Sequence, residues 1–413
     1  MEQTASKLWS KDFVLVLIGQ IMSVFGGGVI RFSLPLHILY ITGDAALLGL
    51  VMGLSTIPMV VMSPIGGALA DRFRKHRIML MVDVLTTVII VLYILIAGMF
   101  TMMVPLVIIT LMMINAANGM YAPTVESSVP VLVPAGSLVR ANSAVMAVNT
   151  LSVLTAPAVA GVLLERVGVD IIIITGAIFF GITAIVDLFI RVPYKKQAAQ
   201  TGVAKAVKSD ISHAMRFVIK ENTNIAKCAA AIFLPTLALN GALLVGLPVL
   251  ITQSLGMSME QMGISQSIMA SGLLAGSIIC GVLGSRLTVK KVYLPMLIAG
   301  LFLTPIGLVF LFEMPTFVAY VIITATGVIA TAAVQPIMIP IYSFAQAETP
   351  VEVMGKVMSL LLMVSAGATA IGLLIFGRLY GFFAGSPHVV IFIAVFMIAA
   401  AMVLSRLLFR KTA

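Results

Sequence analysis

The sequence is poor in charged residues. Only 10% of its 413 residues are Asp, Glu, Lys or Arg, whereas 61% are hydrophobic and the mean hydropathy is +1.17. A soluble globular domain is about 25% charged and roughly half apolar. The composition therefore excludes a soluble globule and predicts a chain that lies in a lipid bilayer.

Cysteine is equally scarce. Cys228 and Cys280 are the only two, and both fall in or beside apolar stretches without a paired motif, which excludes a disulfide framework and a cysteine metal site. The sequence also lacks a His-Glu-x-x-His motif, a nucleotide-binding glycine loop and a convergent acid or cysteine cluster. These absences argue against an intramembrane enzyme, and we expect no cofactor and no metal. We expect no cleavable signal peptide, because the first apolar run is too long.

Acidic residues are fewer than basic ones, 15 against 25, so the formal net charge is +10. The basic residues are divided among the segments between apolar stretches instead of being gathered on one domain. This distribution argues against a nucleic-acid partner and favours a membrane protein with charged loops.

Long apolar runs recur along the chain. A helix needs about 20 apolar residues to cross a hydrocarbon core of about 30 Å, and helices satisfy their own backbone groups there. We predict an all-α membrane protein of twelve transmembrane helices. The spans are expected at residues 13–40, 45–70, 78–99, 102–124, 139–163, 169–190, 225–250, 260–284, 291–312, 316–342, 354–379 and 387–408.

The basic residues also predict the orientation. With the N-terminus in the cytoplasm, Arg166 and Arg378 are the only Lys or Arg residues in the opposite loops. The cytoplasmic segments collect Lys7, Lys11, Arg72, Arg74, Lys75, Arg77, Arg140, Arg191, Lys195, Lys196, Lys205, Lys208, Arg216, Lys220, Lys227, Arg286, Lys290, Lys291, Lys356, Arg406, Arg410 and Lys411. This positive-inside bias supports both the number of spans and two cytoplasmic termini.

The two halves of the chain resemble each other. When the sequence is aligned with itself at a shift of 213 to 216 positions, matching residues come into register, most of them glycine, proline or basic. The matched pairs are Pro35 with Pro248, Gly43 with Gly256, Gly49 with Gly263, Gly67 with Gly281, Leu69 with Leu283, Arg72 with Arg286, Pro134 with Pro350, Arg140 with Lys356, Ser143 with Ser359 and Gly161 with Gly377. We predict parallel six-helix repeats, with the solute site between them near the membrane midplane.

The repeat predicts three segments. Residues 1–190 form an N-terminal bundle, 191–224 a cytoplasmic linker, and 225–413 a C-terminal bundle. Within the linker, Val207, Ile211, Met215 and Val218 recur at helical spacing, which indicates an amphipathic helix on the membrane surface. A plain flexible linker is the alternative, and both descriptions are compatible.

The segment Gly67-Ala-Leu-Ala-Asp-Arg-Phe-Arg-Lys-His-Arg77 resembles the loop between the second and third spans of the major facilitator superfamily. The chain is similar to the macrolide efflux and siderophore exporter branch of that superfamily in three places. They are Leu69-Ala-Asp-Arg-Phe73, Pro130-Val-Leu-Val-Pro134 before Arg140-Ala-Asn-Ser143, and Met215-Arg-Phe217. The resemblance implies export of a drug or metabolite by proton antiport. One departure is Arg74, where the family usually has glycine.

Two further family patterns are matched in part. Ala156-Pro-Ala-Val-Ala-Gly161 resembles the exporters' Gly-Pro-x-x-Gly-Gly and keeps its small residues, although close helix packing explains it equally well. Leu111, Asn115, Asn118 and Gly119 match Leu-x-x-x-Arg-x-x-Gln-Gly without its arginine. Proton coupling through that arginine position is therefore unsupported, but both asparagines could hydrogen-bond a solute.

The signature loop predicts a gate. Asp71 can accept hydrogen bonds from facing helix ends and pair with Arg140 or Lys356, closing the inner mouth. Arg72 and Lys75 join these three as gating candidates. The alternative is that the basic cluster only sets topology.

Arg31 is the only basic residue placed well inside a span, and a charge there is costly unless it faces water or a partner. It is the leading solute-binding candidate, with snorkelling to the outer surface as the alternative. The other solute-binding candidates are Asn115, Asn118, Asn240, Gln266 and Gln335, although helix-to-helix hydrogen bonds would also explain the two glutamines.

His37, Asp83 and Glu126 are the candidates for proton coupling. His37 can titrate near neutral pH, or it is simply polar near the outer mouth. We expect Asp83 to pair with a cytoplasmic basic residue, Asp187 to pair with Arg191 four positions later, and Glu126 to follow the fourth span near the inner mouth.

These observations predict a monomeric secondary transporter in the inner membrane. It is expected to export a small hydrophobic or amphipathic compound, such as a drug, macrolide or siderophore-like molecule, by proton antiport with alternating access. An importer or a lipid or lysolipid flippase on the same fold is the alternative, since a fold does not determine the solute. A membrane receptor is disfavoured by the repeated halves.

Overall fold

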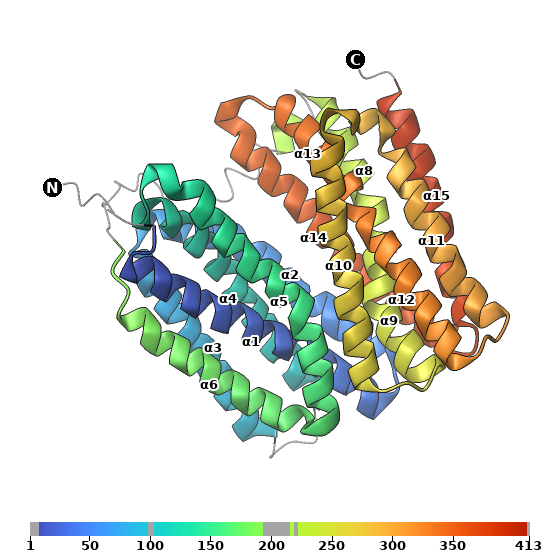
Figure 1. Cartoon of the computed structure of the whole chain (residues 1–413), viewed down its shortest axis with the longest axis horizontal. Coiled ribbons are helices and arrows are strands. Elements are labelled where there is room, and N and C mark those ends of the chain that lie inside the picture. Colours follow the sequence, from blue (N-terminus) through green and yellow to red (C-terminus); the bar gives the residue numbers. More distant parts are fainter. Residues whose placement is uncertain (1–7, 98–102, 193–214, 219–221, 411–413) are drawn as a thin grey trace. The chain divides into compact units, whose positions relative to one another are not determined.

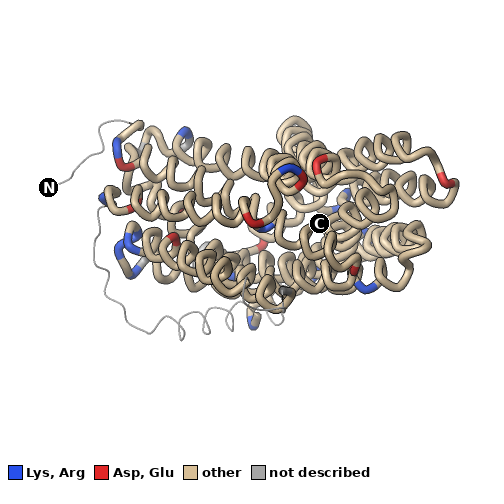
Figure 2. Tube along the Cα trace, turned by 90° about the horizontal axis from the view of Figure 1, so that it is seen from below, with Lys and Arg blue, Asp and Glu red and all other residues tan. Residues whose placement is uncertain are grey.

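The computed structural model describes residues 8–97, 103–192, 215–218 and 222–410. Among these residues, twelve helices are long and apolar enough to cross a membrane, which confirms the predicted all-α membrane fold. Most of their length carries no charge, as Figure 2 shows. The predicted linker helix lies mostly outside the described residues.

Six spans belong to the first half of the chain (Figure 1). They are α1 (Lys11–Thr42), α2 (Ala45–Arg72), α3 (Lys75–Ala97), α4 (Met103–Leu132), α5 (Leu138–Arg166) and α6 (Gly168–Leu188).

The second half supplies the other six spans, and three of these consist of several elements. The ninth begins with the short 3-10 helix η6 (Val289–Lys291) before α11 (Tyr293–Leu311). The seventh span contains α8 (Thr223–Asn240), the π-helix η3 (Gly241–Val245), α9 (Gly246–Pro248) and the π-helix η4 (Val249–Ser254), and the tenth contains α12 (Thr316–Ala332) and α13 (Val334–Ala347). The remaining spans are α10 (Met259–Leu283), α14 (Val351–Phe382) and α15 (Pro387–Phe409).

The prediction was wrong about where the fourth span ends. The sequence suggested an end at residue 124, but α4 continues to Leu132 with Pro123 and Pro130 inside it. Proline is tolerated in membrane helices because neighbouring groups can satisfy the freed backbone carbonyls. Glu126 is therefore an exposed residue within α4, and it does not follow the span as predicted.

The same helix pairings recur in both halves. In the first half α3 packs against α4 and α6, and in the second half α11 packs against α12 and α15. Glycines show two more equivalent pairs, because Gly66 of α2 abuts Met120 of α4 and Gly272 of α10 abuts Val328 of α12. The repeat read from the sequence thus corresponds to a repeated three-dimensional arrangement.

One matched glycine pair has the same backbone geometry in each half. Gly43 has φ +65° directly after α1, and Gly256 has φ +64° shortly after η4. This left-handed conformation ends a helix at low cost only when the residue lacks a Cβ atom. The next helices begin at polar caps, since Asp44 accepts the Ala46 N–H at 2.7 Å and Ser258 accepts the Gln261 N–H at 3.2 Å.

Contacts between Cα atoms divide the chain into two compact units. One contains residues 1–37 and 54–208, and the other contains 38–53 and 209–413. The predicted boundaries at residues 190 and 225 stay a prediction.

The signature loop is a tight connection. Only Phe73 and Arg74 separate α2 from α3, and the Arg77 and Ile78 N–H groups both bond to the Arg74 carbonyl. Arg74 does not have a positive φ, because among the described non-glycine residues only Glu313 does. A glycine is therefore not needed for this turn, which explains how the chain accommodates the departure at Arg74.

Candidate functional site

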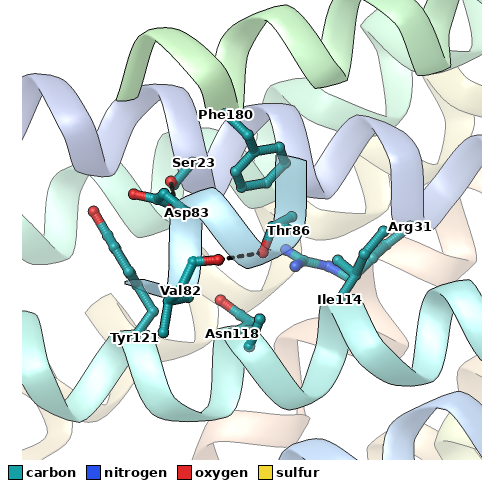
Figure 3. Close-up of a pocket in the computed structure, with 10 residues that line it drawn as sticks. Ser23, Arg31, Val82, Asp83, Thr86, Ile114, Asn118, Tyr121 and Phe180 are labelled. Atoms are coloured by element: carbon teal, nitrogen blue, oxygen red, sulfur yellow. Dashed lines mark hydrogen bonds between the residues drawn. The ribbon is translucent and has the colours of Figure 1, made fainter. Parts of the chain in front are cut away.

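A small polar cavity lies inside the first unit, among helices α1, α3, α4 and α6. Its lining includes Ser23, Arg31, Asp83, Asn118 and Tyr121, and the free space is about 10 Å³, which is what about one water molecule needs. Figure 3 shows Asp83 with Ser23 and Tyr121 at one end and Arg31 at the other. The structure therefore brings two predicted site residues, Arg31 and Asp83, to one cavity.

Helical spacing positions the polar groups that α1 contributes. Gly19, Ser23, Gly27 and Arg31 are four residues apart, so they follow one another along a single face. The glycines leave room on this face. A Cβ atom on Gly27 would lie 3.0 Å from Arg31 Nη1 and 3.4 Å from Phe180 Cζ. The absence of a side chain at position 27 thus lets the guanidinium fold back along the helix.

No hydrogen bond or ion pair is formed by the Arg31 guanidinium within the described part of the chain. Its side chain points toward Thr86 (Figure 3), whose hydroxyl donates to the Val82 carbonyl at 2.8 Å. An arginine in this setting retains its hydrogen-bond donors for a group that enters the cavity, since guanidinium carries five N–H groups. The snorkelling alternative is not favoured by this inward placement.

Asp83 has a different partner from the one predicted. It is 1% exposed, and its Oδ1 accepts a hydrogen bond of 2.7 Å from the Ser23 hydroxyl. The expectation of a cytoplasmic basic partner was wrong, because this residue lies on the inner face of α3, which packs against α6. Burial on that face separates the carboxyl group from the basic loops.

The predicted partner of Asp187 was also wrong. It is 1% exposed in α6, and neither of its carboxyl oxygens has a hydrogen-bond donor in the described residues. Arg191 follows the end of the helix, and its backbone N–H bonds to Asp12 at 2.9 Å. The expected Asp187–Arg191 pair does not form because Asp187 points into the bundle while Arg191 has left the helix.

The remaining solute-binding candidates are dispersed. Asn115 is buried on α4 without lining the cavity. Asn240 Nδ2 donates to Thr369 Oγ1 at 2.8 Å, so this amide already joins α8 to α14. Gln335 packs beside Gly276, and Gln266 is half-buried in α10.

The other titratable and gating candidates lie near helix ends. His37 is half-buried on α1 and interacts electrostatically with Asp170, in the first turn of α6. Lys75 donates to the Ser127 carbonyl of α4, which joins the start of α3 to the neighbouring helix. Arg140 is exposed near the start of α5. Arg72 ends α2 and Lys356 lies in α14. The side chain of Asp71 is not among those that the structure describes.

Three residues that line the cavity, and Asp187 beside it, were missed as site residues by sequence reasoning. Ser23, Thr86, Tyr121 and Asp187 carry no motif, but the first three lie at helical spacing from Arg31, Asp83 and Asn118. Following those faces would have found them. Asp187 had no such signal, because its position depends on how α6 packs against α3.

A second and larger cavity of about 600 Å³ lies in the other unit. It is lined by the end of α10, by residues 284–290 and by α13, including Cys280, Lys290 and Phe344. None of the predicted site residues lines it.

Twelve apolar helices among the described residues, in repeated halves, with a partly buried arginine and buried acids, are typical of multi-pass membrane transporters. A sequence model of the Major Facilitator Superfamily matches residues 16–373, and this chain belongs to that family. It is thus a transporter and not an enzyme.

Known proteins with similar sequence or structure agree with this assignment. Macrolide efflux protein A of Streptococcus pyogenes is 22% identical over 378 residues, which is 89% of each chain. The solved structure of nucleoside transporter NupG has a TM-score of 0.77 at 16% identity, covering 98% of this chain and 100% of its own. A D-xylose-proton symporter has a TM-score of 0.70 at 14% identity, covering 97% and 96%. These structural likenesses show the shared fold.

Proposed function

We propose that this chain is a secondary exporter of a small hydrophobic or amphipathic compound, coupled to proton antiport across the inner membrane. The observation that carries the proposal is the similarity to Macrolide efflux protein A, which extends over 89% of both chains. Macrolides, other drugs and siderophore-like compounds are the solutes we would test first. The mechanism is alternating access, in which the binding residues face one side of the membrane and then the other.

Arg31 is the proposed centre of solute recognition. Its guanidinium has no protein partner among the described residues and lines a cavity with Asn118. The cavity holds about one water molecule, so these two residues would hydrogen-bond a solute only in a conformation of the transport cycle that widens it. Asn115, Asn240, Gln266 and Gln335 stay in the proposal as secondary contacts. Asn240 would have to exchange its bond with Thr369 for one with the solute.

The proposed energy source is a proton gradient, with His37, Asp83 and Glu126 as the sequence-derived candidates. Of these three, Asp83 is the one that lines the cavity with Arg31. The similarity of fold to a D-xylose-proton symporter is compatible with proton coupling. We further propose that Asp71, Arg72, Lys75, Arg140 and Lys356 control opening at the cytoplasmic side.

Everted membrane vesicles from cells that express the chain would test direction and coupling together. Respiration should drive accumulation of a radiolabelled macrolide in these vesicles, and a protonophore should abolish it. Vesicles from cells without the gene provide the background. Accumulation that persists when the proton gradient is collapsed would contradict antiport, and macrolide uptake restricted to right-side-out vesicles would contradict export.

An importer or a lipid or lysolipid flippase is the second candidate. The likeness of fold to a D-xylose-proton symporter, in which solute and proton move in the same direction, is compatible with import. Thermal-shift screening of the purified protein against macrolides, cationic drugs, siderophores, nucleosides and lysolipids separates these classes. Stabilisation by nucleosides or lysolipids alone would favour the second candidate, because only a ligand that binds the folded state raises its stability.

A further inference from the structure

Two buried carboxyl groups meet inside the first unit. Asp83 of α3 and Asp187 of α6 are each 1% exposed, and their side chains lie within hydrogen-bonding reach of one another. The two helices pack along their length, so the pair is held by the bundle itself. No motif or family pattern in this sequence had pointed to Asp187.

Three of the four carboxyl oxygens lack a hydrogen-bond donor in the described structure. They are both oxygens of Asp187 and Oδ2 of Asp83, while Oδ1 of Asp83 accepts from Ser23. Two ionised carboxylates cannot donate to each other, and like charges this close repel strongly away from water. A proton on one of them supplies the missing donor and removes one of the two charges.

Among the described residues that line the cavity beside the pair, Arg31 is the one cation and Asp83 the one acid. On α1, a Cβ atom placed on Gly19 would lie 3.5 Å from Asp187 Oδ1 and 3.7 Å from the Tyr121 hydroxyl, so α4 contributes a neutral phenol beside the pair. Arg31 lines the same cavity but lies on the far side of Thr86 (Figure 3). Within the described residues it forms no ion pair with either carboxyl group.

The charges balance when the pair carries one proton. With both carboxyl groups ionised the pair has a charge of −2, and with one proton the charge is −1, equal and opposite to that of Arg31. An uncompensated charge away from water is costly, so the singly protonated pair is the favoured resting state. The adjacent cavity has space for about one water molecule, which can hydrogen-bond the pair and accept its proton.

We infer that Asp83 and Asp187 form a carboxyl pair that holds one shared proton, and that this pair is the coupling-proton site of the transporter. The coupling role rests on the proton antiport proposed above, whereas the shared proton does not. In the step itself, an O–H bond forms at one carboxyl oxygen as an O–H bond of hydronium breaks, and the reverse occurs on the other side of the membrane. No other bond changes.

Infrared spectroscopy of the purified full-length protein tests the shared proton directly. A protonated carboxyl group has a C=O stretching band that carboxylates lack, and this band shifts in D₂O and on ¹³C-labelling of aspartate. We expect the band in the wild-type protein near neutral pH, with its aspartate component lost in both Asp83→Asn and Asp187→Asn. Asp170→Asn, at an exposed acid on the same helix as Asp187, should retain it.

The wild-type spectrum keeps the test valid even if a variant fails to fold. Absence of an aspartate band from wild-type protein near neutral pH would overturn the proposal, as would an aspartate band that survives both substitutions. Loss of the band when sodium replaces potassium would overturn the assignment to a proton, because it would show that the pair binds a sodium ion instead.

Proteoliposomes with an imposed pH gradient test the coupling. The gradient should accelerate transport of a labelled macrolide by the wild type and the Asp170→Asn variant, and this acceleration should be lost in Asp83→Asn and Asp187→Asn. Retained acceleration in the folded variants would overturn the coupling role. If the wild type moves no macrolide but shows the band, the proposed solute fails while the shared proton stands.

Discussion

At the residue scale, the site depends on small groups as much as on charged ones. Arg31 keeps its position because Gly27 lacks a side chain, and Asp83 keeps its orientation through Ser23. Gly27 and Ser23 lie on the same face of α1 as Arg31. Replacing Gly27, which has no side chain at all, should therefore affect transport.

Gly27→Ala is expected to reduce transport severalfold while the protein still folds. The added methyl would lie 3.0 Å from Arg31 Nη1, and the end of this flexible side chain can move aside. Initial transport rates and the thermal unfolding temperature measure the two effects. Gly181→Ala is the matched control, because its methyl meets only an ordinary contact, 3.8 Å from Thr87. Equal rates in both variants would argue against a constrained Arg31.

Arg31→Ala is expected to abolish most transport without unfolding the protein. Arg31 forms no hydrogen bond or ion pair in the described structure, and the Asp83–Asp187 pair can take up a second proton when the cation is removed, so the fold should be kept. Arg31→Lys should recover only part of the activity, since an ammonium group cannot reproduce the planar donor set. Wild-type transport rates in Arg31→Ala would remove this residue from the site.

At the scale of elements, the helices approach closely where glycines allow it. A Cβ atom on Gly372 of α14 would lie 2.4 Å from the Leu237 carbonyl of α8, whereas one on Gly367 of the same helix would meet nothing within 4 Å. Backbone cannot give way as a side-chain end can. These two glycines therefore provide a matched test of helix packing.

Gly372→Ala is expected to destabilise the second unit by about 1–3 kcal/mol, because the helices must separate to admit the methyl. Gly367→Ala should be neutral or slightly stabilising, since alanine favours the helix by about 1 kcal/mol over glycine. Thermal unfolding in detergent compares the two. Similar unfolding temperatures would show that the α8–α14 crossing is more adaptable than its geometry suggests.

At the scale of the whole molecule, the distribution of basic residues predicts the orientation in the membrane. In a background without Cys228 and Cys280, the single-cysteine variants Arg140→Cys and Lys290→Cys should react with impermeant reagents only from the cytoplasmic side. Cysteines at Arg166 and Glu313 should react from the opposite side. If the cysteines at positions 140 and 290 react from different sides, the twelve-span arrangement with parallel halves is contradicted.

The signature loop belongs to the same scale because its proposed role is to control the conformational cycle. Asp71→Asn is expected to slow turnover more than it weakens solute affinity, since a gating residue affects interconversion of states and not the binding contacts. Transport rates and equilibrium binding measured on the same preparation separate the two effects. A pure loss of affinity would count against a gate.

The sequence by itself determined the number of spans, the repeated halves and the general place of Arg31. These properties follow from the local cost of placing each residue in lipid, which does not depend on its neighbours in space. It failed at the end of α4, because two prolines that normally stop helices are tolerated in a membrane bundle.

Only the tertiary structure decided which buried groups meet. Asp83 and Asp187 lie about a hundred positions apart, and the basic residue four positions after Asp187 was the wrong partner. The packing of α3 against α6 turns both acids inward, and the small residues of α1 leave space for Ser23 and Arg31 beside them. Such contacts depend on the rotation of each helix about its axis, which apolar runs in lipid specify poorly because every face of the helix is hydrophobic.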